Sequence, residues 1–334
     1  MSQVVDAPAR EPTGAGRLPA AGIPLARLRD FALIPAILVL LVVGAFVDPS
    51  FLSGTNLTNI LQQQTELGLV VLAETLILIA GRFDLSLEST VGLAPALGLL
   101  VPAWAHLPLW TAVPICLLAG VLIGAFNGLL IVKFRLSAFV LTLGMLIILR
   151  GLQIGLTGGK SLFEIPLSFS YLGAVSWLGV PTSIYLLVAA YAIGIVALGF
   201  LRQGRSLYAI GGNVDAAKAA GIRTDRVVWF VYAIGGLLAA LAGLLLVGRL
   251  GSVAASQGQG MIFTVFAAAV IGGVSLEGGK GTVFGALTGV LVLGLINNIL
   301  LLAGVPAQWT QAINGLIIIL ALVLARLTSG KAQD

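Results

Sequence analysis

The sequence predicts an all-α, polytopic membrane protein with about ten transmembrane helices and with both termini in the cytoplasm. Of the 334 residues, 59% are hydrophobic and only 9% are charged, whereas about 25% of the residues of a soluble domain are charged. So few charged side chains cannot cover a water-facing surface, and lipid must cover most of this one. The 43 glycines agree with this prediction, because glycine lets membrane helices pack closely.

Ten apolar runs follow one another along the chain, and most approach the length of about 20 residues that a membrane helix needs. Residues 1–30 are rich in Pro, Ala, Gly and Arg, which predicts a disordered cytoplasmic tail rather than a signal peptide. Residues 31–326 form one transmembrane domain, and residues 327–334 form a second cytoplasmic tail. The predicted spans are 31–47, 59–80, 89–103, 110–132, 137–157, 180–200, 227–247, 262–274, 283–302 and 308–324.

The positive charges test this count of spans, because Lys and Arg accumulate in short cytoplasmic loops. With ten spans and the amino terminus inside, 15 of the 18 Lys and Arg residues fall on the cytoplasmic side. Lys160 and Arg249 fall outside, and Arg150 falls within the fifth span. One span more or fewer would move the later basic clusters outside, so the count of ten is supported. The net charge of +5 therefore reports membrane topology and does not indicate a nucleic-acid partner.

The longest predicted cytoplasmic segment, residues 201–226, has the composition of a docking surface. Within it, Asn213 can cap a short helix, Asp215 lies in the first turn, and Gly221 can end the helix in a left-handed turn. Residues 214–220 carry small and charged side chains, so another protein can approach them closely. An ordinary solvated loop helix is the alternative interpretation.

Polar side chains inside the spans are candidates for a translocation path, because ionisable groups are costly in a membrane and are usually functional there. One stripe on the second span, within about an 80° arc at about 100° per residue, consists of Asn59, Gln63, Glu66 and Glu74. It predicts a solute or proton path, or alternatively hydrogen bonds between helices or a position of residues 59–66 at the membrane interface. Arg150 is expected to pair with Glu74, to bind solute hydroxyls, or to anchor on a carbonyl or carboxylate. Further groups suited to a polyhydroxylated solute are Asn127, Asn297, Asn298, Gln311 and Asn314.

The chain offers no set of residues for catalysis. Cys116 and His106 are each the only residue of their type, which excludes an intramolecular disulfide and a conventional zinc site. Residues 155–161, GLTGGKS, have three residues where a phosphate-binding loop needs four. No metal or cofactor site is therefore expected in this chain, and any ATP and Mg²⁺ must be bound by another chain.

Several motifs stand in a fixed order along residues 51–324. They are FLSGTNLTNIL (51–61), DLS (84–86), NGLLI (127–131), TLGM (142–145), RG (150–151), LTGG (156–159), GR (204–205), YAIGGN (208–213), AA (216–217), GI (221–222) and GGVSLEGGKG (272–281). In this order they resemble the permeases of ribose-type bacterial ABC importers, in the superfamily of branched-chain amino acid and ribose permeases.

The resemblance implies two permeases side by side around a path, two cytoplasmic ATPase subunits and an extracytoplasmic solute-binding protein, in the cytoplasmic (inner) membrane of a bacterium. The second permease is either another copy of this chain or a paralogous chain. The resemblance also implies that a coupling segment, about residues 204–226, seats a short helix in a cleft of the ATPase. Its predicted coupling residues are Arg205, Asn213, Asp215, Ala216, Ala217, Lys218, Gly221 and Arg223.

The predicted translocation path combines the polar residues above with two residues of the DLS motif. It consists of Gln63, Glu74, Asp84, Ser86, Asn127, Arg150, Asn297 and Asn298. The chain departs from the family at residues 81–89, where GRFDLSLES replaces the usual GGIDLSVGS, and at Glu74, where relatives usually have Gly. The charges of Glu74, Arg82 and Glu88 fit a sugar other than ribose, a polyol or a cationic solute, or pairing with one another.

The predicted function is a non-enzymatic permease subunit that moves a small sugar or sugar-like solute by alternating access, while a partner ATPase hydrolyses ATP. The alternative is an ion-coupled secondary transporter that uses Glu74 as its proton or ion site.

Overall fold

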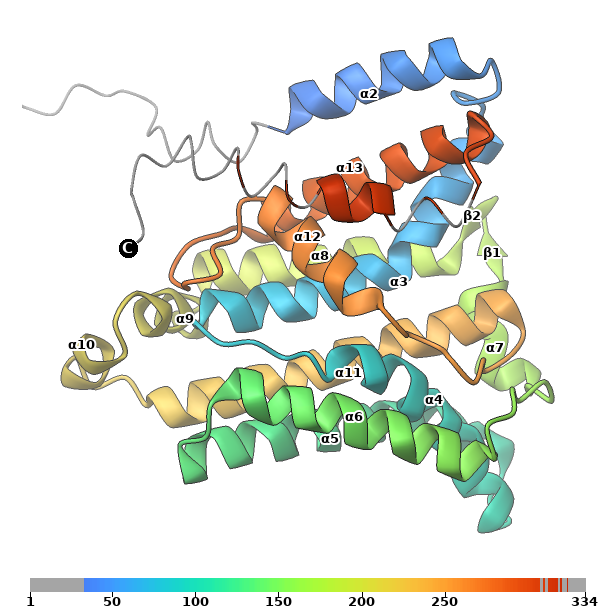
Figure 1. Cartoon of the computed structure of the whole chain (residues 1–334). Coiled ribbons are helices and arrows are strands. Elements are labelled where there is room, and N and C mark those ends of the chain that lie inside the picture. Colours follow the sequence, from blue (N-terminus) through green and yellow to red (C-terminus); the bar gives the residue numbers. More distant parts are fainter. Residues whose placement is uncertain (1–32, 307–308, 310–311, 318, 320–322, 324–334) are drawn as a thin grey trace, which may run out of the picture.

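The computed structural model describes residues 33–306, 309, 312–317, 319 and 323, so the predicted tails 1–30 and 327–334 lie outside the described residues. The described part is a helix bundle whose long helices run along roughly one direction (Figure 1). Within it, six helical segments are long and apolar enough to cross a membrane. They are α4 (Leu87–Trp104), the 3₁₀ turn η1 (Leu109–Thr111) with α5 (Ala112–Phe134), α6 (Ala138–Thr157), α8 (Thr182–Phe200), α11 (Thr224–Leu250) and α13 (Val283–Leu302).

Helix α3 (Gly54–Ile79) forms much of the core. Ser53 caps its amino-terminal end, because Ser53 Oγ accepts a hydrogen bond from the backbone N–H of Asn56 at 3.2 Å. From Thr65 to Ile79 every residue of α3 is buried, as expected for a helix that is surrounded by protein on all sides. Two shorter apolar helices, α2 (Ile34–Val47) and α12 (Met261–Ile271), complete this part of the bundle.

Glycines bring α5 and α11 into direct backbone contact. A Cβ atom on Gly236 would collide with the carbonyl oxygen of Gly120, and a Cβ on Gly124 would collide with the carbonyl oxygen of Tyr232. Small residues at such positions let membrane helices approach closely and gain van der Waals contact. Glycine therefore has the role at this interface that the composition predicted, which is to let two helices pack closely.

Two of the spans are interrupted in the same manner. Helix α3 is followed by a non-helical first break (residues 80–86) and then by α4, and α11 is followed by a non-helical second break (residues 251–260) and then by α12. Both α4 and α12 begin inside the bundle and not at one of its ends (Figure 1). The predicted spans 89–103 and 262–274 are thus not independent short helices, because each crosses the bundle together with the break before it.

The two ends of the bundle carry different elements. At one end lie α9 (Arg202–Gly212) and α10 (Val214–Ala219), and at the other lie α7 (Leu167–Ala174) and a small hairpin (Figure 1). The hairpin pairs β1 (Ser176–Trp177) antiparallel to β2 (Val180–Pro181), with Ser176 opposite Pro181 and Trp177 opposite Val180. The sequence predicted α10, but not α9 before it.

The boundaries of the predicted spans vary in accuracy. The spans 137–157 and 283–302 match α6 and α13 to within one residue, whereas α3 begins at Gly54 and not at residue 59 because Ser53 caps it. The last predicted span, 308–324, lies only partly within the described residues, of which 312–317 are helical.

We expect Gly236→Ala to lower the free energy of unfolding by about 1–3 kcal/mol, because the added methyl group overpacks the α5–α11 contact. Loss of the monodisperse elution peak after heating in detergent measures this change. The matched control is Gly151→Ala in α6, where a Cβ would meet nothing within 4 Å. Equal thermal stability of the two variants would contradict the assigned contact.

Candidate functional site

A buried network of polar side chains surrounds the start of α4. Asp84 Oδ1 accepts hydrogen bonds from the backbone N–H of Ser86 at 2.9 Å and from Ser86 Oγ at 2.6 Å. The side-chain amide of Asn127 donates to Ser86 Oγ at 2.8 Å, and Glu74 Oε1 accepts from the backbone N–H of Asp84 at 3.3 Å. All four residues are 0% exposed. The network therefore joins four of the predicted path residues, from α3, α5 and the first break.

The first break also receives hydrogen bonds from neighbouring helices. The hydroxyl of Tyr232 on α11 donates to the carbonyl of Phe83 at 2.7 Å. The backbone N–H of Leu85 donates to Thr142 Oγ1 on α6 at 3.1 Å. Non-helical backbone at membrane depth is tolerated only where the protein supplies such partners, so these side chains make the break possible.

Glutamine and arginine side chains hold the second break in the same way. Gln153 on α6 donates through Nε2 to the carbonyl of Ala254 at 3.1 Å, and Arg150 donates through Nη1 to the carbonyl of Gln257 at 2.9 Å. The amide of Gln257 in turn donates to the carbonyl of Val91 in α4 at 2.8 Å. The second break is thereby fixed to both α4 and α6.

Glu88 joins the two broken spans to each other. It lies in the first turn of α4, and its Oε2 accepts a hydrogen bond from the backbone N–H of Ile262, in the first turn of α12, at 3.1 Å. Its Oε1 lies 3.4 Å from Arg150 Nη2. Because the amino-terminal ends of helices carry partial positive charge, two helix ends and one guanidinium converge on this carboxylate.

This arrangement decides among the expectations for Arg150. The side chain anchors on a carbonyl and on the carboxylate of Glu88, so the expected pairing with Glu74 is wrong. Among the ion pairs of the described residues none joins Glu74, Arg82 and Glu88 to one another, because Glu88 takes Arg150 as its partner.

The polar stripe expected on the second span divides into two parts. Asn59 and Gln63 are exposed on the described chain, whereas Glu66 and Glu74 are buried. Glu66 Oε1 accepts a hydrogen bond from Arg249 Nε at 2.8 Å, so this carboxylate holds α3 to α11. Gln63 therefore lies apart from the network of Glu74.

The two asparagines of α13 also lie outside that network. Asn298 exchanges side-chain hydrogen bonds with Asn56 of α3 at 3.0 and 3.1 Å. The Oδ1 atom of Asn297 is buried and has no hydrogen-bond partner among the described residues. Asn298 thus links two helices, while Asn297 keeps a free acceptor.

Three oxygen atoms of the network around α4 likewise have no donor among the described residues. They are Glu74 Oε2, Asp84 Oδ2 and Asn127 Oδ1. Buried acceptors without partners are costly, so these atoms are suited to a water molecule, a proton or a solute hydroxyl. A role of these residues in translocation stays a prediction.

Sequence reasoning missed the residues that hold the breaks in place, namely Thr142, Gln153, Tyr232 and Gln257. A signal for two of them exists, because Thr142 and Gln153 lie on nearly the same face of α6, about 20° apart at about 100° per residue. Within the part of the chain that the structure describes, no group of three or more His, Cys, Asp or Glu side chains is placed to hold a metal ion.

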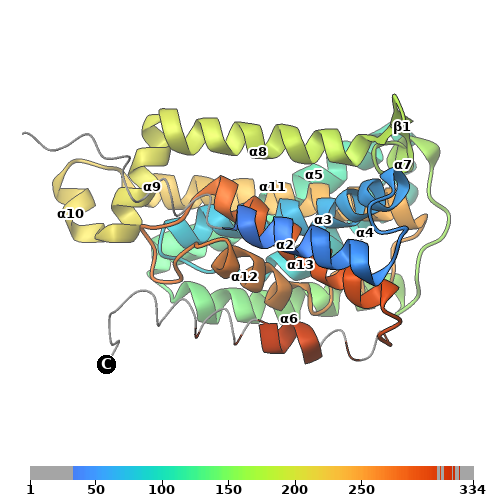
Figure 2. The same ribbon diagram turned by 90° about the horizontal axis from the view of Figure 1, so that it is seen from above.

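Helix α10 projects from one end of the bundle (Figures 1 and 2). Asn213 caps it, because Asn213 Oδ1 accepts from the backbone N–H groups of Asp215 and Ala216 at 3.0 and 2.9 Å. Gly221 follows the helix with a φ of +79°, as predicted for a left-handed turn. Ala216 is exposed, whereas Ala217 is 3% exposed and packs toward the bundle.

The charged coupling residues are accessible around α10. Lys218 Nζ lies 3.3 Å from Asp215 Oδ1, and Arg205 Nη1 donates to the carbonyl of Phe200 at 3.4 Å. Arg223 is exposed immediately before α11. Of the predicted coupling residues, Ala217 alone is buried on the described chain, so the others are available to a partner protein.

We expect Glu88→Ala to destabilise the protein by about 3–5 kcal/mol, because it leaves the Arg150 guanidinium, whose side chain is only 15% exposed, without its carboxylate. Thermal denaturation in detergent measures this loss. The matched control is Asp215→Asn, which breaks the ion pair between Asp215 and Lys218. Their side chains are 93% and 47% exposed, so the loss of this pair costs at most about 1 kcal/mol. If the two variants lose the same stability, Glu88 does not join the broken spans.

Residues 56–322 match the family described as the branched-chain amino acid transport system / permease component. The chain is 35% identical over 293 residues to the ribose import permease protein RbsC of Escherichia coli K12, covering 86% of this chain and 91% of that protein. It is 35% identical over 292 residues to RbsC of Bacillus subtilis 168, covering 86% and 90%. It is 34% identical over 296 residues to the autoinducer 2 import system permease protein LsrC of Escherichia coli O157:H7, covering 88% and 86%.

These matches confirm the resemblance that the ordered motifs predicted. Together with the apolar helices, they identify a multi-pass protein of the bacterial inner membrane. The chain belongs to the family of branched-chain amino acid transport system permease components.

Proposed function

We propose that this chain is the membrane-spanning permease subunit of an ATP-driven importer for a small sugar or sugar-like solute. The relatives described above are import permeases for ribose and for autoinducer 2, and the similarity covers at least 86% of this chain. In this proposal the chain crosses the membrane ten times, both termini lie in the cytoplasm, and the chain is not itself an enzyme.

The structural observation that carries the proposal is α10. It is short, it is capped at both ends by Asn213 and Gly221, and it presents Ala216 on its outer face at one end of the bundle. A short, capped helix with small and charged outward side chains fits a cleft of another protein, as expected for a docking element. The proposed partner at this end is a cytoplasmic ABC ATPase that binds ATP and Mg²⁺.

Two further partners complete the proposal. A solute-binding protein delivers the solute at the opposite end of the bundle, near α7 and the hairpin. A second permease, which is another copy of this chain or a paralogous chain, lies beside the first and encloses the path.

The contacts of α9, which precedes α10 directly, support a mechanism of alternating access. The backbone of Gly211 in α9 lies against the Ile79 carbonyl, where α3 ends and the first break begins. Closure of the ATPase would move α10 with α9 and would thereby displace the first break and α4. Such rocking of packed elements opens a path to one side at a time, and no chemistry in this chain is required.

For the solute, the free oxygen atoms of Glu74, Asp84 and Asn127 are the candidate hydrogen-bond acceptors. Their chemistry suits the hydroxyl groups of a sugar or polyol. The carboxylate of Glu88 is already occupied by Arg150 and by the start of α12, so it is not assigned to the solute.

We expect Ala216→Trp to reduce solute-stimulated ATP hydrolysis by about tenfold or more, since a loss of about 1.4 kcal/mol in docking already produces that factor. The measurement uses lipid nanodiscs that contain this chain with its ATPase and binding protein. The matched control is Ala192→Trp, an exposed position in the middle of α8 and away from both ends of the bundle, which should leave this activity unchanged. Full activity of Ala216→Trp would rule out α10 as the docking element.

Replacing Glu74 separates the two transport classes. We expect Glu74→Gln to keep ATP-dependent uptake within about tenfold of the native chain at every pH, because the amide oxygen can still accept from Asp84 and a single hydrogen bond contributes about 0.5–1.5 kcal/mol. Uptake by proteoliposomes across a pH series measures this. Complete loss of uptake by Glu74→Gln at all pH values would favour the proton-coupled alternative. A second variant, Glu74→Leu, removes the hydrogen-bond acceptor for the backbone N–H of Asp84 and should mainly lower the stability of the protein.

A further inference from the structure

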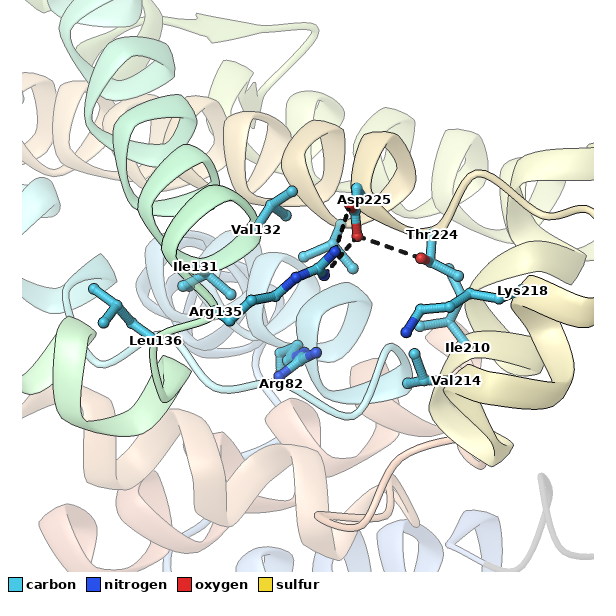
Figure 3. A pocket seen from close by; sticks show the side chains of 11 residues that line it. Arg82, Ile131, Val132, Arg135, Leu136, Ile210, Val214, Lys218, Thr224 and Asp225 are labelled. Atoms are coloured by element: carbon cyan, nitrogen blue, oxygen red, sulfur yellow. Dashed lines mark hydrogen bonds and ion pairs between the residues drawn. The ribbon is translucent and has the colours of Figure 1, made fainter.

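A cavity lies beside α10, between the end of α5, the start of α11 and the first break (Figure 3). Its volume is about 340 Å³, which falls within the range of about 300–1,000 Å³ that small-molecule sites occupy. Aliphatic side chains such as Ile131 and Val228 form its walls. The cavity is separate from the buried network around α4, and the proposed transport function does not use it.

Basic side chains dominate the polar lining of this cavity. Arg82 lies in the first break, Arg135 is the residue that caps the carboxyl-terminal end of α5, and Lys218 lies in α10 (Figure 3). Asp225 is the one acidic residue in the lining, so the four ionisable groups carry a net charge of +2. Three segments that are distant in sequence thus bring positive charge to one space.

The single acid is already engaged. Arg135 donates through Nη1 and Nη2 to the two carboxylate oxygens of Asp225, each at 2.9 Å. Thr224 Oγ1 lies 3.4 Å from Asp225 Oδ1. The Arg135 side chain is 63% exposed, so the cavity is open to solvent at this edge.

Arg82 has no comparable partner. Its Nε atom is buried and makes no hydrogen bond among the described residues. A buried guanidinium N–H without an acceptor is costly. Arg82 also stands at the position of the second Gly in the family motif at residues 81–89, so its charge is a departure from that motif. The first break therefore holds a cation that the local structure does not explain.

We propose that this cavity binds a phosphomonoester dianion, with Arg82 and Lys218 as its principal ligands and Arg135 at its rim. The net charge of +2 matches a phosphomonoester, which carries about −1.5 to −2 charges at pH 7. Arginine offers a planar set of donors that fits phosphate oxygens, and lysine adds a point charge. The volume leaves room for a small organic group beyond the phosphate.

Occupation of the cavity would connect α10 to the bundle. A phosphate held by both Arg82 and Lys218 would bridge the first break and the helix that is proposed to dock the ATPase. The ligand would then regulate how strongly α10 is coupled to α4. A phosphorylated sugar fits this role, as the product of a kinase-type reaction on an imported sugar, and so does the headgroup of phosphatidate in the lipid.

The test needs only this chain in nanodiscs, so its outcome does not depend on the proposed transport function. Equilibrium dialysis in phosphatidylcholine nanodiscs measures the binding of radiolabelled glucose 6-phosphate, with glucose as the uncharged control. Native mass spectrometry of the chain from discs that contain phosphatidate measures retained lipid. Both are repeated for Arg82→Gln, for Lys218→Gln and for the control Arg202→Gln, an exposed cation at the start of α9 that does not line the cavity.

We expect saturable binding of one of the two probes, weakened about tenfold or more by Arg82→Gln and by Lys218→Gln and unchanged by Arg202→Gln. Binding of glucose 6-phosphate identifies a soluble ligand, and retention of phosphatidate alone identifies a lipid headgroup. Lys218 is largely exposed, so its variant remains informative if Arg82→Gln fails to fold. The proposal is overturned if neither probe binds, or if all three variants bind as the native chain does.

Discussion

Peptide groups of non-helical backbone inside a membrane bundle have no water to bind, so each needs a hydrogen-bond partner within the protein. The first break and the second break meet this requirement with side chains such as Tyr232, Gln153 and Arg150. Glu88 then joins the two, because it belongs to α4 and accepts from the first turn of α12. The placement of α4 and α12 depends on this carboxylate and on its pair with Arg150.

This constraint gives the intramembrane polar residues a structural role beside any role in transport. Glu74 binds the backbone N–H of Asp84, and Arg150 binds the carbonyl of Gln257. The first break follows Ile79, the last residue of α3, whose carbonyl accepts from the backbone N–H of Gly279 at 2.9 Å. Because Gly211 of α9 also packs against Ile79 and Gly81, α9, which leads directly into the proposed docking helix, touches the end of α3 and the first break through backbone.

Local features were predictable from the sequence and tertiary ones were not. Apolar length placed α6 and α13 to within one residue, and the Asn213 cap with the Gly221 turn predicted α10, because each signal lies within a few residues. The breaks were missed because their conformation depends on partners from other helices. Likewise Glu88 and Arg150 stand 62 residues apart, and a helical projection of one span cannot show such a pair.

The most direct test of the proposed transport function is solute uptake by proteoliposomes, with a panel of radiolabelled pentoses, hexoses and polyols. One set contains this chain with its ATPase, its binding protein and ATP, and the other contains this chain alone under a proton gradient. We expect uptake of at least one sugar in the first set only, and its loss when ATP or the ATPase is omitted. Accumulation of solute by the lone chain under the gradient would contradict the assignment as an ATP-driven permease.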